Sequence, residues 1–387
     1  MGRRVELDWL RGLLLVLMTV THLPTWYSSH WGQPLGFVSA AEGFVFVSAF
    51  LVGSVYGRMA REHGVAAMSR RVWYRAAKIY AAHAGLLLLL LLVLVPVAVH
   101  FGATAITDLA SFYLVHPRTA LVAGLLLAYD PPLLDILPMY VLFLAVSPFL
   151  VRAAGRWGYG RVLLGSALIW LLAQLGAGPM LHHLLVDAAA LPVPYAQTGA
   201  FSWLAWQFLW TLGLGAGMAA NGMAGRVRVP PSWVIAAGCI ALVGLVWRHV
   251  DGQVPAGPAW LVYAFDKWHL GALRLLDFGA LAVLVVAARA VIRAAAERSV
   301  LAVMGSESLP VFCVHLVICL AALVLVGDTA PATLHWQDSA WLAAALACLA
   351  LTAGALRMGA RMFVPRRTPP RAVLVPLSAR PPARRAR

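Results

Sequence analysis

The residues most suited to chemistry lie on one face of the first apolar segment. Arg11 and His22 stand eleven positions apart, which at about 100° per residue places them within about 20° of the same helical face. A rise of about 1.5 Å per residue separates them by about 16 Å along the axis, and Asp8 can pair with Arg11 across one turn. Ionisable groups cost roughly 2.5–3.5 kcal/mol each inside a bilayer, so they indicate candidate functional sites.

His22 is a candidate general base, because an imidazole accepts and returns a proton near neutral pH. Glu42 opens the next apolar segment among small residues, and antiparallel helices would bring its carboxylate to the depth of His22. We expect Glu42 to orient the imidazole. The alternatives are an interfacial histidine at a helix end, a solvated glutamate in a first turn, and an arginine that only anchors the segment.

A second membrane histidine, His315, follows the polar stretch that holds Gly305, Glu307 and Ser308. Glu307 and Ser308 are suited to capping the helix that carries it. A histidine in a membrane interior needs a partner or a function. We expect His315 either to line the same cavity as His22 or to brace it.

A basic stretch precedes the third apolar segment. Arg71, Arg75 and Lys78 share a helical face by their spacing, and guanidinium groups bind phosphate in a bidentate manner. The stretch therefore predicts contacts with a phosphorylated ligand. Taken alone, the stretch is better explained by ordinary positive charge beside lipid phosphates.

The composition indicates a membrane protein. Of 387 residues, 62% are hydrophobic and 12% charged, and the mean hydropathy is +0.81. Apolar runs of roughly 17–25 residues recur, each long enough to cross a bilayer core of about 30 Å. We expect an all-α, polytopic transmembrane bundle of about ten helices, at 9–25, 41–58, 79–99, 134–152, 161–178, 201–220, 232–248, 271–289, 305–327 and 339–357.

The positive charges indicate the topology. With a cytoplasmic N-terminus and ten helices, the outer segments keep only Arg118, Arg248, Lys267 and Arg274 of the 30 lysines and arginines, as the positive-inside rule requires. Both termini are then cytoplasmic and the chain is a multi-pass protein of the cell inner membrane. The net charge of +15 needs no nucleic acid partner. The start of the chain is read as a retained helix, since no small-residue cleavage site directly follows it.

The connections divide the chain into a transmembrane domain, 1–360, and a basic cytoplasmic tail, 361–387, expected to be disordered. We expect 58–78 to be an interfacial helix or loop and 100–133 to hold a re-entrant or surface-lying helix. The loops 179–200 and 249–270 are outer. The four cysteines lie in apolar runs without ligand spacing, so we expect buried thiols, no disulfide and no metal.

Together these pieces resemble the membrane acyltransferase-3 superfamily, and in particular its OpgC-type branch. The Arg-x10-His of its first helix is met by Arg11 and His22. Its Arg-x-x-Arg-Ile-Tyr-Pro signature is approached by residues 75–81, with Lys78 for the second arginine and Ala81 for proline. Its late helix is similar to Gly305, Ser308, Phe312 and His315, with Phe312 for tyrosine. The stretches that are similar to the OpgC-type branch in particular include 41–46, 137–140, 206–207, 213–217, 266–267 and 308–312. The similarity to the superfamily spans nearly all of 5–357.

The resemblance implies an acyltransferase that succinylates osmoregulated periplasmic glucans from cytoplasmic acyl-CoA, with succinyl-CoA as the donor of that branch. His22 would be the base and Glu42 its orienting partner. The donor would contact Asp8, Arg11, Arg71, Arg75, Lys78, Tyr80 and His315. The glucan or a succinyl carboxylate would meet Asp135, Gln207, Asp266, Lys267 and Arg274.

Several alternatives stay open. The donor could be acetyl-CoA, the acceptor another glycan, and the route a direct transfer or an acyl-histidine intermediate. A transporter of an acidic solute would also use a polar stripe, although the chain lacks the inverted repeats and paired broken helices typical of that class. The lipid bilayer is the remaining expected partner, and a homo-oligomer is compatible with the sequence.

Overall fold

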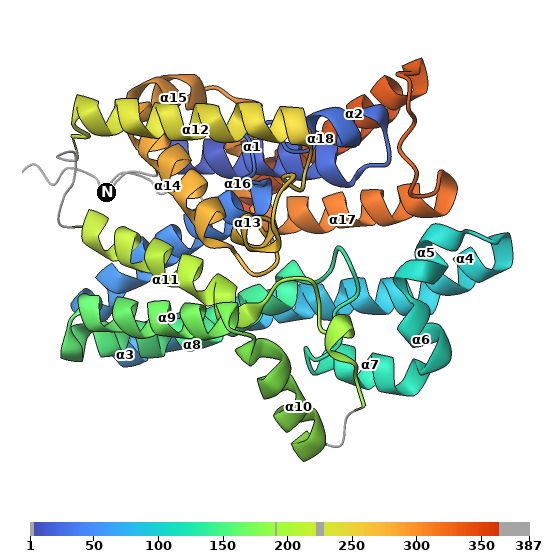
Figure 1. The fold of residues 1–387 in the computed structure, drawn as a ribbon, viewed down its shortest axis with the longest axis horizontal. Helices are drawn as coiled ribbons and strands as arrows, with labels where there is room; N and C mark the ends of the chain where they lie inside the picture. The colour runs from blue at the N-terminus through green and yellow to red at the C-terminus, as the bar shows by residue number, and fades with distance from the viewer. Residues whose placement is uncertain (1–3, 190–191, 222–227, 364–387) are drawn as a thin grey trace, which may run out of the picture.

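The centre of the fold is α1 (Val5–His22), which packs against α3, α15, α16 and α17. The structure is a computed structural model and describes residues 4–189, 192–221 and 228–363. Every regular element within these ranges is helical, which confirms the all-α expectation. Figure 1 shows many of the long helices lying roughly side by side, with the short helices α6 and α7 at the end that holds α4 and α5.

The long helices agree with most of the predicted segments. They are α1 (Val5–His22), α3 (Ala40–Leu89), α8 (Ile136–Trp157), α9 (Tyr159–Gln174), α11 (Trp203–Ala220), α12 (Pro231–Asp251), α14 (Ala272–Ala287), α17 (Ser308–Leu325) and α18 (Trp336–Phe363). The shorter ones are α2 (Trp26–Trp31), a π-helical turn (Leu90–Leu94), α4 (Val95–Phe101), α5 (Thr104–Leu109), α6 (Ser111–Val115), α7 (Pro117–Leu125), α10 (Ala177–Ala189), a 3-10 turn (Tyr195–Gln197), α13 (Ala259–Ala264), α15 (Arg289–Ala296) and α16 (Val300–Ser306).

The segment 58–78, expected to be an interfacial helix or loop, is helical on both sides of a single residue. Gly64 has φ +84° and ψ 160° inside α3, a conformation that glycine adopts readily. Phe44 and Ser48 from the arm before Gly64 line one cavity with Arg75 and Ile79 from the arm after it. The two arms of α3 therefore run back beside each other, and a one-residue turn replaces the expected connection.

The region 100–133 folds into α5, α6 and α7. The apolar piece that was expected to be too short to span is α7, a helix of nine residues. It lies against the second arm of α3, where the Tyr80 hydroxyl donates to the carbonyl of Leu125 at 2.9 Å. His83, which is fully buried, lies with Nε2 3.2 Å from the carbonyl oxygen of Gly124.

Glycines bring the helices around the site into backbone contact. A Cβ on Gly12 of α1 would lie 1.9 Å from the carbonyl oxygen of Leu301, and one on Gly305 would lie 1.8 Å from that of Asp8. In the same way, a Cβ on Gly217 of α11 would lie 2.0 Å from the carbonyl oxygen of Phe50. Small residues at such crossings are typical of membrane helices. The contact between α1 and α16 also fixes Arg11 beside the start of α17.

The structure supports a multi-pass membrane protein. Five described helices are long and apolar enough to span a bilayer, or seven if the bent pairs α9–α10 and α14–α15 are each one span. In this count the helical segment Ala40–Phe101 is one candidate span, although its two arms run back beside each other from the turn at Gly64. The number of about ten spans and the cytoplasmic placement of the termini stay predictions. In Figure 1 the N-terminus, the start of α12 and α15 lie at one end, opposite α4 and α5.

The helix α18 continues to Phe363, three residues into the segment 361–387 that was expected to be a tail. Residues 364–387 lie outside the described part of the chain.

Candidate functional site

The structure brings His22 and His315 together. His22 is the last residue of α1 and is half-buried, whereas His315 lies in the middle of α17 and is fully buried. Nδ1 of His22 lies 3.3 Å from Nε2 of His315, and the rings stack with centroids 5.4 Å apart. Of the two arrangements expected for His315, this one is the brace.

The neighbours of His315 indicate which nitrogens carry hydrogen. The Thr19 hydroxyl donates to the carbonyl of Leu15 at 2.8 Å, so its single hydrogen is used. Nδ1 of His315 lies 3.1 Å from the same hydroxyl oxygen, which can then only accept. We infer that His315 carries its proton on Nδ1 when neutral, because the Thr19 oxygen and Sγ of Cys319, 3.5 Å away, can both accept it, and that its Nε2 accepts from Nδ1–H of His22. We infer that Nε2 of His22 keeps a free lone pair, the form that a general base requires.

Arg11 lies about three turns before His22 on α1 and borders a small internal cavity. Its guanidinium donates to the hydroxyl of Ser308 and lies over the ring of Phe44, 5.8 Å from the centroid. The cavity has a volume of about 40 Å³ and its other polar lining residues are Ser48, Arg75, Tyr140 and Ser308. Nε of Arg11 is buried without a hydrogen-bond partner in the described part of the chain. Two arginines with a spare donor make this cavity suited to an anion or a carbonyl oxygen.

The rest of the predicted phosphate cluster points elsewhere. Lys78 lies over the ring of Tyr74, 4.8 Å from its centroid, and Arg71 is exposed. Tyr80 uses its hydroxyl hydrogen on Leu125. Of the basic stretch, only Arg75 borders the cavity with Arg11. Sharing a helical face does not bring all three basic side chains to the cavity, because α8 packs over part of that face.

Glu42 does not take the place that we expected. Its carboxylate pairs with the guanidinium of Arg274 at 2.8 Å and accepts from the backbone N–H of Ser39 at 3.0 Å, while His22 bonds to His315 instead. Glu42 and Arg274 are 0% and 3% exposed. Arg274 also donates to the carbonyls of Phe265, at 2.8 Å, and Phe37. The pair thus ties the loop before α3 to α14, and the expectation that Glu42 orients His22 is corrected.

A well-anchored loop presents Lys267 towards this pair. The indole N–H of Trp206 donates to the carbonyls of Lys267 and Trp268, at 3.2 and 3.1 Å. The ammonium of Lys267 lies 4.7 Å from the ring centroid of Trp268. Burial lowers the pKa of Lys267, while the nearby carboxylates of Glu42 and Asp135 oppose that shift. The positive charge of Lys267 also acts electrostatically on the imidazole of His22.

Asp266, the neighbour of Lys267, shapes the loop. Its carboxylate accepts from the backbone N–H of His269 at 2.6 Å and lies 2.9 Å from Nδ1 of the same residue. Burial alone would raise the pKa of Asp266, but the hydrogen bonds from His269 hold it below its usual value. Its oxygens are thus engaged in the turn rather than directed to a ligand.

Two neighbouring carboxylates, Asp135 and Asp130, lie near Lys267. Asp135 accepts from the backbone N–H of Ala200 at 3.2 Å, and burial raises its pKa to about 6. Asp130, absent from the sequence-based candidates, is 2% exposed, and neither carboxylate oxygen has a partner among the described residues. Burial and the charge of Asp135 raise the pKa of Asp130 well above its usual range. Both β-carbons lie close to Gly199, where a side chain would collide with them.

Gln207 serves helix packing. Its amide oxygen accepts from the hydroxyl of Ser166 at 2.6 Å, and its amide nitrogen donates to the carbonyls of Ser166 and Leu204, at 2.8 and 3.1 Å. Both amide hydrogens are used, so Gln207 joins α9 to α11. The predicted substrate contact at Gln207 has no free donor to support it.

Sequence reasoning missed Thr19, Asp130 and Asp277. Thr19 lies one turn before His22, and that spacing was the available signal. Asp277 accepts from the backbone N–H of Phe37 at 3.3 Å and is one turn from Arg274. Asp130 lies in a loop with no periodic pattern, so nothing in the sequence marked it.

Comparisons with known proteins identify the family. The family model described as OpgC protein matches residues 3–360. The chain belongs to the OpgC family. As a member it is a multi-pass membrane protein, and the membership supports an acyltransferase activity. The search of curated proteins and the search of solved structures each found no match.

Proposed function

We propose that this OpgC-family protein is an integral-membrane acyltransferase of the cell inner membrane. It transfers a succinyl group from a cytoplasmic acyl-CoA to a hydroxyl of a periplasmic glucan. The single observation that carries the proposal is the ordered chain from Thr19 through His315 to His22, which leaves Nε2 of His22 free. Arg11 and Arg75 line a small cavity together, and the charge of Lys267, which lies near Asp135, acts on His22.

The reaction that fits is a direct transfer. Nε2 of His22 takes the proton of the acceptor hydroxyl while that oxygen forms a bond to the thioester carbonyl carbon. The carbon–sulfur bond then breaks, and the imidazolium returns its proton to the leaving sulfur. His315 stabilises the imidazolium, since its Nε2 still accepts from Nδ1–H of His22. His315 is thus a positioning residue.

The surrounding charges suggest how the two substrates are held. The arginines at the small cavity suit the carbonyl groups of the donor arm. Lys267 suits the free carboxylate of a succinyl group, which an acetyl group lacks. Asp130 and Asp135 suit sugar hydroxyls, because a carboxylate accepts strong hydrogen bonds from such donors.

Transfer by the purified protein tests this function. In detergent, with isotopically labelled succinyl-CoA and glucan, we expect labelled succinyl glucan in the mass spectrum without any membrane gradient. Labelled acetyl-CoA in a parallel reaction is expected to give less product. A transporter would yield no product under these conditions, and that result would refute the proposal.

Changes at the brace test the inferred tautomer. His315→Ala removes the acceptor of the His22 Nδ1–H and should lower kcat by about 10–10²-fold. His315→Gln offers an oxygen to the same hydrogen and should recover part of the rate. Thr19→Val removes the acceptor for His315 Nδ1–H, and we expect a smaller loss with KM little changed. Equal activity of His315→Ala and the wild type would show that His22 needs no brace.

A further inference from the structure

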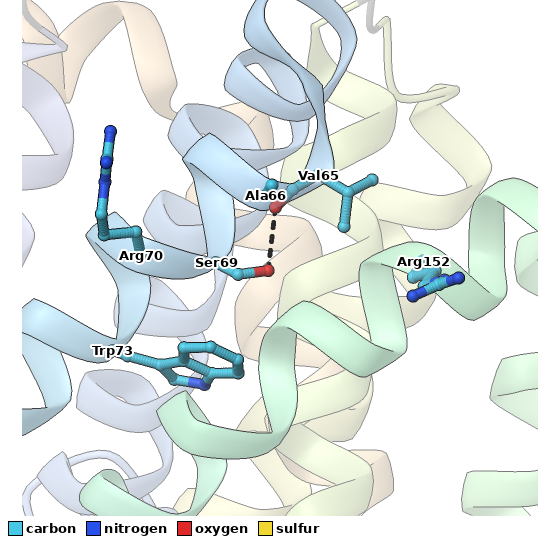
Figure 2. A pocket seen from close by; sticks show the side chains of 6 residues that line it. All are labelled: Val65, Ala66, Ser69, Arg70, Trp73 and Arg152. Carbon is cyan, nitrogen blue, oxygen red and sulfur yellow. Dashed lines mark hydrogen bonds between the residues drawn. The ribbon is translucent and has the colours of Figure 1, made fainter.

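The space inside the bundle narrows towards the histidine pair. A surface cavity of about 740 Å³ opens between the second arm of α3 and α8, and Figure 2 shows Trp73 and Arg152 at its walls. The internal cavity at Arg11 has a volume of only about 40 Å³, room for about three water molecules at about 10–15 Å³ each. A ligand larger than this can pass from Arg11 to His22 only if side chains between them move.

One face of α17 links Arg11 to the histidine pair. Ser308, Phe312 and His315 follow one another at spacings of four and three residues, which places them on the same side of a helix. Ser308 accepts from the guanidinium of Arg11. His315 bonds to His22. The ring of Phe312 therefore occupies the step between the arginine and the two imidazoles.

The ring of Phe44, from the first arm of α3, faces Phe312 across this step. The two rings stack with centroids 6.0 Å apart and an interplanar angle of 22°. The guanidinium of Arg11 lies 5.8 Å from the centroid of Phe44, and the rings of Phe312 and His315 are also 5.8 Å apart. Both phenyl rings are buried and line the inner cavity. They form its wall towards the histidines.

The backbone that carries both rings is fixed, whereas the rings are free of polar ties. The Tyr140 hydroxyl donates to the carbonyl of Phe44 at 2.8 Å, and Phe312 lies inside the regular helix α17. A phenyl ring has no polar atom, so it can change rotamer without breaking a hydrogen bond. Phe312 stands where the superfamily pattern that this chain resembles has tyrosine, whose hydroxyl would require a partner when buried. An opening at this step thus needs only side-chain movement.

We propose that Phe44 and Phe312 form a gate between the arginine-bordered cavity and the histidine pair. Two substrates that meet inside a bilayer from opposite ends need such a barrier, because a passage open at both ends would let ions run down the membrane potential. The stacked rings close the passage when no donor is bound. The thin arm of the acyl donor turns them aside as it carries the thioester to His22, a step that rests on the proposed function.

Proton entry into proteoliposomes in the absence of both substrates tests the barrier. A pH-sensitive dye in the lumen reports the flux after an acid pulse outside, with a potassium ionophore to balance charge. We expect Phe44→Ala and Phe312→Ala each to raise the flux at least tenfold over the wild type. Phe143→Ala is the matched control, because Phe143 is equally buried, at 7% exposed, but packs on Trp210 between α8 and α11. Its flux should equal that of the wild type.

Coenzyme A tests whether the gate lies on the route of the donor. Added outside to Phe312→Ala vesicles, it should lower the proton flux at least threefold, because its arm would occupy the widened passage. It should leave the low flux of wild-type vesicles unchanged. A flux through Phe312→Ala that coenzyme A does not lower would take the rings off the donor's route and overturn the proposal.

Two further results would overturn the gate. One is a wild-type flux in both alanine variants. The other is an equal rise in Phe143→Ala, which would indicate a general loosening of the bundle. The flux is measured without transfer, so the two proposals can fail separately. A leak through Phe312→Ala that coenzyme A closes, in a protein whose wild type transfers no label, would refute the proposed function alone. Active wild-type enzyme whose alanine variants stay sealed would refute this inference alone.

Discussion

The His22→Ala variant is expected to lose acyl transfer by about 10²–10⁴-fold, the usual contribution of a general base. The loss should appear in kcat, because the imidazole acts on the proton that moves in the transition state. Nε2 of His22 is the group with a free lone pair at the end of the chain through His315 and Thr19. Labelled product from purified enzyme, measured over time at saturating donor, gives the rate.

His30→Ala serves as the control for this variant. His30 lies eight residues further along, in α2, where its ring stacks on Trp26 at a centroid distance of 3.9 Å and is exposed. We expect wild-type transfer from it. Both variants should insert and unfold at the wild-type temperature. Near-normal transfer by a folded His22→Ala protein would contradict the role of His22.

The Arg274→Ala variant is expected to fail in folding rather than in chemistry. It leaves the carboxylate of Glu42 fully buried and without its charge partner, and breaking a buried pair in this way costs about 3–5 kcal/mol. The loop before α3 would also lose its attachment to α14. We expect little protein in the membrane fraction and a lower unfolding temperature for what remains.

A double variant separates folding from catalysis. Arg274→Met with Glu42→Gln removes both charges, keeps the bulk of the side chains and should restore most of the protein to the membrane. If Glu42 is an anchor, as its contacts with Arg274 and Ser39 indicate, the double variant regains transfer as well. A double variant that folds but stays inactive would instead support the catalytic role that the sequence suggested for Glu42.

The sequence predicted the parts of this site that depend on helical period. The spacing of Arg11 and His22 placed them on one face of α1, and the cost of charge in a bilayer marked His315. These predictions rest on local geometry, which the sequence encodes directly. Both histidines then meet because the α1–α16 glycine contact sets the depth of α17 against α1.

The errors concern contacts between distant segments. Glu42 finds Arg274, which lies 232 positions away, and no periodicity could indicate that pairing. The turn at Gly64 depends on one residue with a positive φ, so the sequence did not show that the helices on both sides of it run back beside each other. Gln207 was expected at the substrate, but its partner Ser166 became visible only once α9 was placed beside α11.

Sidedness of transfer in proteoliposomes tests most directly that two substrates reach His22 from opposite ends. Glucan would be enclosed in the lumen, and labelled succinyl-CoA added outside to vesicles sorted by whether residues 364–387 are accessible to protease. The account predicts labelled glucan in vesicles with that tail outside, and none in the opposite orientation. Label that appears only when both substrates share one compartment would contradict it.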